Sequence, residues 1–567
     1  MHPRSGLKAF ALAVAAFLLS AQSAPERIEY AFTPVMAQGA LQAVEVDLRF
    51  RGDADGETAL RLPDAWGGRA ELWRAITALE AVSGARMAPG EGPAQRVLTH
   101  RPGARVHVRY RIVQDYEGPP SAREGNAYRA VVQPGYFHLI GEAAMVTPAG
   151  ADPATPVRFT MRRLPRGWSF ASDLEHDGLA LRDVWASISV GGDFRVLHAP
   201  SPNLRVAVRG DWSFSDADFI ARVDQIVAGQ REFWGDSASP YLVTVLQTAQ
   251  PQPGWLSIGG TGLRDAFAFF ATVNAEAPPI TRTLAHESLH TWIPLAIGGA
   301  PQEDEALQYW LSEGFTEFYT ARLLVRQGLW GVAEFTEDLN TMLRAYAFSS
   351  AREAPNARIG ADFWNDQDVN NLPYQRGRLM ATIWDARLRA RGRSLDLLMH
   401  TLRDRVASGE AAGAAGPAFV RLAAASMEGA FVSDYENHIV AGQPVLLPED
   451  VFAPCGRVTT FEAAPFHRGF DIAATSANNN TIAGVNPASP AYAAGLRDGM
   501  VILRRDAGVI GDAEQELIYV LRDGDAERVI RYLPRGEGMR LVQRLDLATP
   551  LEGDALTQCL RVLGGAG

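Results

Sequence analysis

The stretch that decides the fold is "TLAHESLHTW", residues 283–292, in which His286 and His290 are four positions apart and Glu287 directly follows the first. Residues i and i+4 of an α-helix lie on one face, so both imidazoles can point at a single metal ion. Glu287 is then close enough to reach a water molecule beside that metal. The stretch therefore predicts a helical metal site. The alternative is an ordinary amphipathic helix whose histidines are hydrogen-bonded core or surface groups.

A second stretch, "QYWLSEGFTEFYTARLL" at residues 308–324, contains Glu313 and Glu317 at helical i, i+4 spacing among apolar and aromatic residues. Carboxylates are costly to bury unless a cation or a hydrogen-bond donor compensates them. A catalytic zinc ion has three protein ligands and keeps a fourth position open. We therefore predict Glu313 as the third ligand and Glu317 as the acceptor that orients one histidine ligand. In the alternative, both carboxylates face solvent.

Together, the HExxH arrangement and the downstream "SEGFTEFY" resemble the gluzincin metallopeptidases. Within that group the chain is most similar to glycyl aminopeptidase-type enzymes, which have a β-rich N-terminal domain, a thermolysin-like catalytic domain and a PDZ domain. The resemblance is strongest over residues 285–378. It implies that His286, His290 and Glu313 bind one Zn²⁺ per chain and that Glu287 is the general base.

Further along, "LPYQRGRLMATIWD" at residues 372–385 is similar to the tyrosine segment of this family. The resemblance implies that Tyr374 donates its hydroxyl to the oxyanion of the tetrahedral intermediate. Judged from the residues alone, a tyrosine that follows Pro373 at the start of a helix is also explained by packing.

One segment departs from the family pattern. The family has a Gly-Gly-Leu-Glu edge strand, and in its aminopeptidases an acid there holds the free amine of the substrate. The corresponding stretch, "IGGTGLRDAFAFFAT" at residues 258–272, has Gly259 and Gly260 but no glutamate, and Asp265 is the nearest acid. The glycines still permit close approach of an extended peptide. The sequence therefore does not decide whether the protein holds the free N-terminus of a peptide or an internal segment.

The N-terminus and the overall charge bear on location and partners. Arg4 and Lys8 precede a short apolar run, and small residues follow, which predicts a signal peptide at residues 1–23 and an exported protein, periplasmic or secreted. An uncleaved anchor is the alternative, and no membrane span is expected in the mature chain. The net charge of −11 argues against a nucleic-acid partner. In an oxidising compartment Cys455 and Cys559 are expected to pair; otherwise they are two buried thiols.

Length and patterning predict a multidomain α+β protein. We expect an N-terminal antiparallel β-rich domain at residues 24–213, because short alternating runs dominate there. A thermolysin-like, mainly helical zinc peptidase domain with a small sheet on one edge is expected at residues 214–445. A PDZ-like β domain is expected at residues 455–567, from "SPAYAAGLRDGMVIL" within it.

The C-terminal domain has two interpretations. Residues 468–470, "RGF", match the loop that receives a peptide carboxylate in PDZ domains, with backbone N–H groups as donors. Met500 stands where an acid is common. The alternative is a degenerate domain that only packs against the catalytic domain.

These features predict a zinc-dependent peptide hydrolase that acts on peptides or proteins and is expected to be an aminopeptidase. Two alternatives on the same site are an endopeptidase and a hydrolase with other substrates. A third is an inactive peptide-binding protein that uses its PDZ domain.

Overall fold

The computed structural model describes residues 27–121, 125–236, 239–250, 255–299, 302–410, 414–427 and 429–565. The expected signal peptide at residues 1–23 lies outside them. Within the described residues, no helix is both long and apolar enough to span a membrane. The chain divides into two compact units, of which the first comprises residues up to Gly118, Tyr128–Trp168 and Leu174–Gly192.

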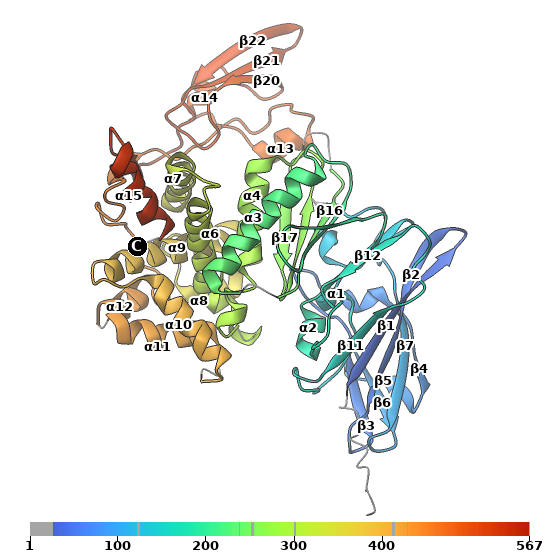
Figure 1. Cartoon of the computed structure of the whole chain (residues 1–567). Coiled ribbons are helices and arrows are strands. Elements are labelled where there is room, and N and C mark those ends of the chain that lie inside the picture. Colours follow the sequence, from blue (N-terminus) through green and yellow to red (C-terminus); the bar gives the residue numbers. More distant parts are fainter. Residues whose placement is uncertain are drawn as a thin grey trace, which may run out of the picture. The chain divides into compact units, whose positions relative to one another are not determined.

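The first unit is built from β-sheets with two short helices (Figure 1). Its elements are β1 (Ile28–Ala37), β2 (Ala40–Arg51), β3 (Glu57–Arg61), β4 (Ile76–Ser83), β5 (Ala85–Pro89), β6 (Gln95–His100), β7 (Arg105–Ile112), β8 (Val131–Gln133), β9 (Tyr136–Ile140), α1 (Gly141–Ala144), β10 (Thr147–Pro148), β11 (Val157–Met161), α2 (Leu181–Trp185) and β13 (Ile188–Gly192). One sheet has the order β11-β1-β2-β7-β4, a second has the order β10-β3-β6-β5, and β13, β9 and β8 are neighbours in a third.

The predicted β-rich N-terminal domain is confirmed, with one difference in strand direction. β11 runs parallel to β1, from the pair Ile28 and Val157 to the pair Phe32 and Met161, whereas β2 runs antiparallel to β1. A parallel pair needs a long connection, and more than a hundred residues separate these two strands. Short alternating runs in a sequence do not reveal such a distant pairing.

The second unit contains a five-stranded sheet beside a large group of helices. The sheet has the order β14-β15-β16-β18-β17. Its strands are β14 (Arg195–His198), β15 (Leu204–Arg209), β16 (Tyr241–Gln247), β17 (Ile258–Gly262) and β18 (Ala266–Ala271). β15, β16 and β18 are parallel, and β17 pairs antiparallel with β18 at the edge. A small sheet with β17 as its edge strand is therefore present as predicted, but β14 and β15 lie before the predicted domain start at residue 214.

The boundary between the units falls earlier than the predicted residue 213. Residues 195–209 form β14 and β15, and β15 pairs with β16. The run "LRVAVRG" alternates like the preceding strands, so its period does not reveal which sheet it joins.

Ten α-helices of the described residues lie within the predicted catalytic domain, residues 214–445. They are α3 (Asp216–Trp234), α4 (Ala277–Leu289), α5 (Tyr309–Ser312), α6 (Gly314–Arg326), α7 (Val332–Phe348), α8 (Asn356–Asp362), α9 (Gln367–Arg389), α10 (Leu395–Ala407), α11 (Ala415–Met427) and α12 (Gly429–Asp434). The hydroxyl of Ser215 accepts a hydrogen bond from the N–H of Asp218 and caps α3. Figure 1 shows α3 and α4 beside β16 and β17.

The helix that contains Tyr374 starts earlier than expected. α9 begins at Gln367, because the carboxylate of Asp366 accepts hydrogen bonds from the N–H groups of Asp368 and Val369. Pro373 therefore lies inside the helix. The sequence interpretation placed Tyr374 at a helix start because proline usually occupies the first turn. In the structure, Tyr374 is in the third turn and thus projects from a continuous helix.

Part of the C-terminal segment packs into the core of the helical region. β19 (Gly456–Ala463) pairs with β23 (Arg540–Leu547), and Val458 and Leu545 join the core of the helical region. The C-terminal helix α15 (Gly553–Gly564) is in the same core, and a disulfide joins Cys455 to Cys559, as predicted. This part of the segment is continuous with the helical domain.

The remaining C-terminal elements surround their own core, which includes Phe470, Ile482 and Leu496. They are α13 (Ile472–Ala477), α14 (Pro490–Ala493), β20 (Val501–Ala507), β21 (Leu517–Asp523) and β22 (Ala526–Tyr532). Within "SPAYAAGLRDGMVIL", residues 490–493 form the short helix α14, and β20 begins at Val501. Met500 is buried in this core, which explains an apolar residue at that position. In the proposed carboxylate loop, the N–H of Gly469 already donates to His467 Nδ1.

Candidate metal centre

α4 holds the two histidines at its C-terminal end. His286 lies in its last turn and His290 is its C-cap residue. Leu284, Ala285 and Leu289 are buried and fix this helix against its surroundings. Since the two histidines are four residues apart, their side chains leave the same face of the helix.

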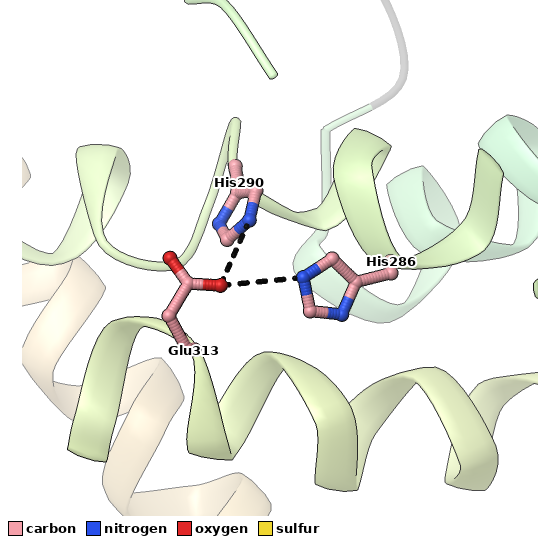
Figure 2. Close-up of side chains that lie close together, drawn as sticks. All are labelled: His286, His290 and Glu313. Carbon is pink, nitrogen blue, oxygen red and sulfur yellow. Dashed lines mark ion pairs between the residues drawn. The ribbon is translucent and has the colours of Figure 1, made fainter. Parts of the chain in front are cut away.

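The carboxylate of Glu313 completes a group of three donors. Its Oε2 lies 3.3 Å from His286 Nε2 and 3.5 Å from His290 Nε2, as Figure 2 shows. One ligand atom from each of the three residues lies within 4.8 Å of the others. Glu313 stands at the junction of α5 and α6, where it is the C-cap of one helix and the N-cap of the next. The structure therefore brings Glu313 beside both histidines, as a third ligand would have to be.

The far side of each imidazole contacts an acceptor. His286 Nδ1 lies 2.9 Å from Glu317 Oε1, and His290 Nδ1 lies 2.9 Å from the carbonyl oxygen of Ile293. A carbonyl only accepts hydrogen bonds, so Nδ1 of His290 must carry the proton. In a neutral ring this leaves the Nε2 lone pair on the side of Glu313. An imidazole with Nδ1 held and Nε2 turned inward is the arrangement of a metal-ligating histidine, so these residues fit a zinc ion.

The charges of the centre favour a cation. Burial alone lowers the pKa of His286, but the carboxylates of Glu313 and Glu317 outweigh it and raise this pKa to about 10. Burial raises the pKa of Glu313 and Glu317, yet the neighbouring cations and hydrogen bonds bring both pKa values below the usual range. In the metal-free protein a proton on His286 thus balances part of this negative charge.

Glu287 points toward the edge strand of the sheet. Its Oε2 accepts a hydrogen bond from the backbone N–H of Gly262 over 3.2 Å. A Cβ at Gly262 would lie 2.6 Å from the carbonyl oxygen of Glu287 and 2.6 Å from Cβ of His290. Only glycine therefore allows β17 to approach α4 so closely.

Tyr374 of α9 packs against His286. Its ring stacks on that of His286, with centroids 5.9 Å apart and planes 27° apart, and its hydroxyl forms a hydrogen bond with Glu313. Burial, followed by the nearby carboxylates of Glu313 and Glu287, raises the pKa of Tyr374 well above its usual value. The hydroxyl consequently stays protonated and remains a hydrogen-bond donor at any ordinary pH.

The structure thus brings together all the residues that the sequence singled out for the site. Asp265, in contrast, lies in the turn between β17 and β18 and not on the edge strand. Sequence reasoning missed Gly262, which the pattern "GGTG" contains but whose close approach depends on tertiary packing. It also missed Arg282 and Arg378, although their i±4 spacing from His286 and Tyr374 was visible.

Comparison with known proteins agrees with this geometry. Residues 280–371, which include both histidines, Glu287 and Glu313, match the M61 glycyl aminopeptidase family. The match confirms the resemblance over the segment that forms the metal centre, and Tyr374 lies just beyond it. Among curated protein sequences, no significant relative is found.

The fold is similar to that of an aminopeptidase N family protein from Idiomarina loihiensis, at 15% identity, with 94% of this chain and 100% of that chain covered and a TM-score of 0.64. A weaker likeness, with a TM-score of 0.46 and 16% identity, is to an M1 zinc metallopeptidase from Deinococcus radiodurans, over 74% of this chain and 95% of that one. The first likeness shows a shared fold. The family match over residues 280–371 supports a peptidase.

Proposed function

We propose that this chain is a zinc-dependent peptide hydrolase, in which His286, His290 and Glu313 hold one Zn²⁺ and Glu287 is the general base. The observation that carries the proposal is the convergence of two Nε2 atoms and one carboxylate oxygen within 4.8 Å. The family match over the same segment supports the same chemistry.

The residues around the metal have distinct roles in this proposal. When bound, zinc would polarise the scissile carbonyl and lower the pKa of an attacking water molecule. Glu287 accepts the proton of that water and passes it to the leaving amine. Tyr374 donates its hydroxyl to the oxyanion that develops on the carbonyl. Glu317 keeps His286 in the orientation that a ligand requires.

The substrate is proposed to lie extended along β17. An edge strand offers backbone donors and acceptors to a further strand, and β17 is the edge strand next to α4. We favour an aminopeptidase because the family match is to glycyl aminopeptidases. β17, "IGGTG", contains no acid that could hold a free amine, and this observation favours the endopeptidase alternative.

Two further parts of the proposal concern location and the C-terminal segment. We propose export to the periplasm or the exterior, because the disulfide between Cys455 and Cys559 needs an oxidising compartment. We also propose that residues around Arg468–Phe470 belong to a PDZ-like module that receives a peptide C-terminus. The short helix α14 followed by β20 supports this assignment.

The decisive experiment measures zinc content and then peptide cleavage with the purified full chain. Cleavage of aminoacyl substrates with a free amine, and not of N-acetylated ones, would establish an aminopeptidase. Cleavage of blocked, internally quenched peptides would establish an endopeptidase. Zinc bound without cleavage of either kind would contradict peptide hydrolysis, and absence of zinc binding would contradict the metal centre itself.

A further inference from the structure

A second layer of charged residues lies one helical turn away from the metal centre. Arg282 precedes His286 by four residues on α4, Glu317 follows Glu313 by four on α6, and Arg378 follows Tyr374 by four on α9. In each helix the spacing places the two residues on the same face. The helices α4, α6 and α9 thus contribute residues both to the metal centre and to the charged layer beside it.

Asp338 of α7 joins this layer from a fourth helix. Its Oδ1 accepts a hydrogen bond from Arg282 Nε over 2.9 Å, and its Oδ2 accepts one from Arg378 NH1 over 2.6 Å. Arg378 is buried, with a side chain 3% exposed, and Arg282 is partly exposed. Asp338 forms no hydrogen bond or ion pair with His286, His290 or Glu313, so its influence on the centre must pass through the arginines.

The two oxygens of Glu317 have different partners. Oε2 pairs with Arg282 NH2 and lies 3.9 Å from Arg378 NH1. Oε1 lies 2.9 Å from His286 Nδ1. Both arginines therefore approach one oxygen, and the other remains available to the imidazole.

Asp338 maintains this division. Two arginines and two carboxylates balance in charge, and Arg378 is much closer to Asp338 than to Glu317. Without the charge of Asp338, both guanidinium groups would have Glu317 as their nearest carboxylate. The two guanidinium groups would then compete with His286 for Oε1 of Glu317, because a guanidinium group binds both oxygens of a carboxylate well.

We propose that Asp338 is a positioning residue of the metal centre: it holds Arg282 and Arg378 on one oxygen of Glu317, which leaves the other oxygen to orient His286 as a ligand. This inference rests on the proposed function, since it concerns zinc affinity at the same histidine. It extends the centre from its ligands to a charged layer contributed by α4, α6, α7 and α9.

The experiment compares zinc affinity by competition with a chelator, at a temperature where circular dichroism shows every variant folded. Asp338→Asn keeps the side-chain size and removes the charge, so we expect zinc to bind about tenfold more weakly. Asp338→Glu should restore most of the affinity. The absorption spectrum of the cobalt-substituted protein should change in Asp338→Asn, because it reports ligand geometry.

A matched control is the ion pair between Arg322 of α6 and Asp396 of α10. Arg322 NH1 lies 2.6 Å from Asp396 Oδ1, as Arg378 NH1 lies from Asp338 Oδ2, and the two arginine side chains are 4% and 3% exposed. Asp396→Asn therefore removes the charge from a comparable buried ion pair, and Asp396 forms no hydrogen bond or ion pair with Glu317. Its zinc affinity should equal that of the wild type.

The outcomes separate the two proposals. Failure of the wild type to bind zinc would overturn the proposed function and this inference with it. Zinc binding by the wild type, with unchanged affinity in Asp338→Asn or an equal loss in Asp396→Asn, would overturn the inference alone. If Asp338→Asn does not fold, Arg282→Lys replaces it, because one ammonium group cannot reproduce the two contacts of the guanidinium; unchanged affinity there would also overturn the inference.

Discussion

The backbone N–H of Gly262 donates a hydrogen bond to Oε2 of Glu287 over 3.2 Å, which joins the edge strand β17 to the proposed general base. The same glycine approaches the backbone of α4 so closely that a methyl group has no room. The position of the base is therefore determined by a strand that is distant in the sequence. The strand along which we place the substrate is also the one that orients Glu287.

This contact makes Gly262→Ala a test of the arrangement. The new methyl group would lie 2.6 Å from backbone and Cβ atoms of α4, so the strand must shift away and lose its hydrogen bond to Glu287. We expect a loss of stability of about 1–3 kcal/mol, measured by thermal denaturation, and a lower kcat. Gly135→Ala, where nothing lies within 4 Å, is the control and should change neither. Wild-type kcat in Gly262→Ala would contradict this role of the contact.

Glu287→Gln tests the base itself. The amide still accepts a hydrogen bond from Gly262 but cannot take a proton, so we expect kcat to fall by about 10²–10⁴ while zinc content stays unchanged. Activity is measured with the best peptide of the substrate panel, and zinc by atomic absorption. The exposed Glu276, at the start of the same helix, provides the control Glu276→Gln, which should behave as the wild type. Full activity of Glu287→Gln would remove the proposed mechanism.

Tyr374→Phe tests the oxyanion donor. The variant keeps the ring that stacks on His286 and loses only the hydroxyl, so kcat should fall by about 10²–10³ with little change in KM. Zinc content should not change, since no ligand is altered. The half-buried Tyr435, which packs on Trp310, offers the control Tyr435→Phe with unchanged kcat. A rise in KM of about 10²–10³ with unchanged kcat would instead indicate that Tyr374 only binds the substrate.

The pKa of His286 predicts a pH dependence of the metal-free protein. Glu313 and Glu317 raise this pKa from 6.5 to about 10 in the folded state. A raised pKa contributes stability that is complete below about pH 6.5 and is lost as the pH rises toward about 10. The lowered pKa values of Glu313 and Glu317 have the opposite effect, because their contribution is present above about pH 4.5 and is lost in acid.

Zinc competes with that proton, which gives two measurable consequences. The increase in Tm caused by zinc should grow between about pH 6.5 and pH 10, because the metal-free protein loses stability over this range. Calorimetry in buffers of different ionisation enthalpy should show about one proton released from His286 on binding at about pH 8. Zinc binding with no proton release would contradict the raised pKa.

Local rules explain why much of the centre was predictable from the sequence. The spacing of His286 and His290 fixes their common face once a helix forms, and the buried apolar residues around them ensure that it does. The role of Glu313 and Glu317 in the centre was predictable for another reason. Two carboxylates among aromatic residues are costly to bury unless a cation or a hydrogen-bond donor compensates them. The disulfide was predictable because the expected signal peptide placed the only two cysteines in an oxidising compartment.

Other features depend on contacts that local patterns do not encode. The period of "LRVAVRG" indicates a strand but not its partner, so the boundary between the units was placed about twenty residues too late. The start of α9 depends on the cap at Asp366. Pro373 instead suggested a later start, because proline is common in the first turn of a helix. The unit assignment of β19 and β23 depends on side chains that pack into the helical core.

The sequence by itself identified the candidate metal ligands, because helical periodicity places His286 and His290 on one face without help from the rest of the chain. Only the tertiary structure decided how these ligands are held. Gly262, Arg282, Asp338 and Arg378 come from a strand and three helices, and they act on the centre through packing and charge pairing at a distance in the sequence. Such contacts form only when the chain has folded, and no local pattern fixes them in advance.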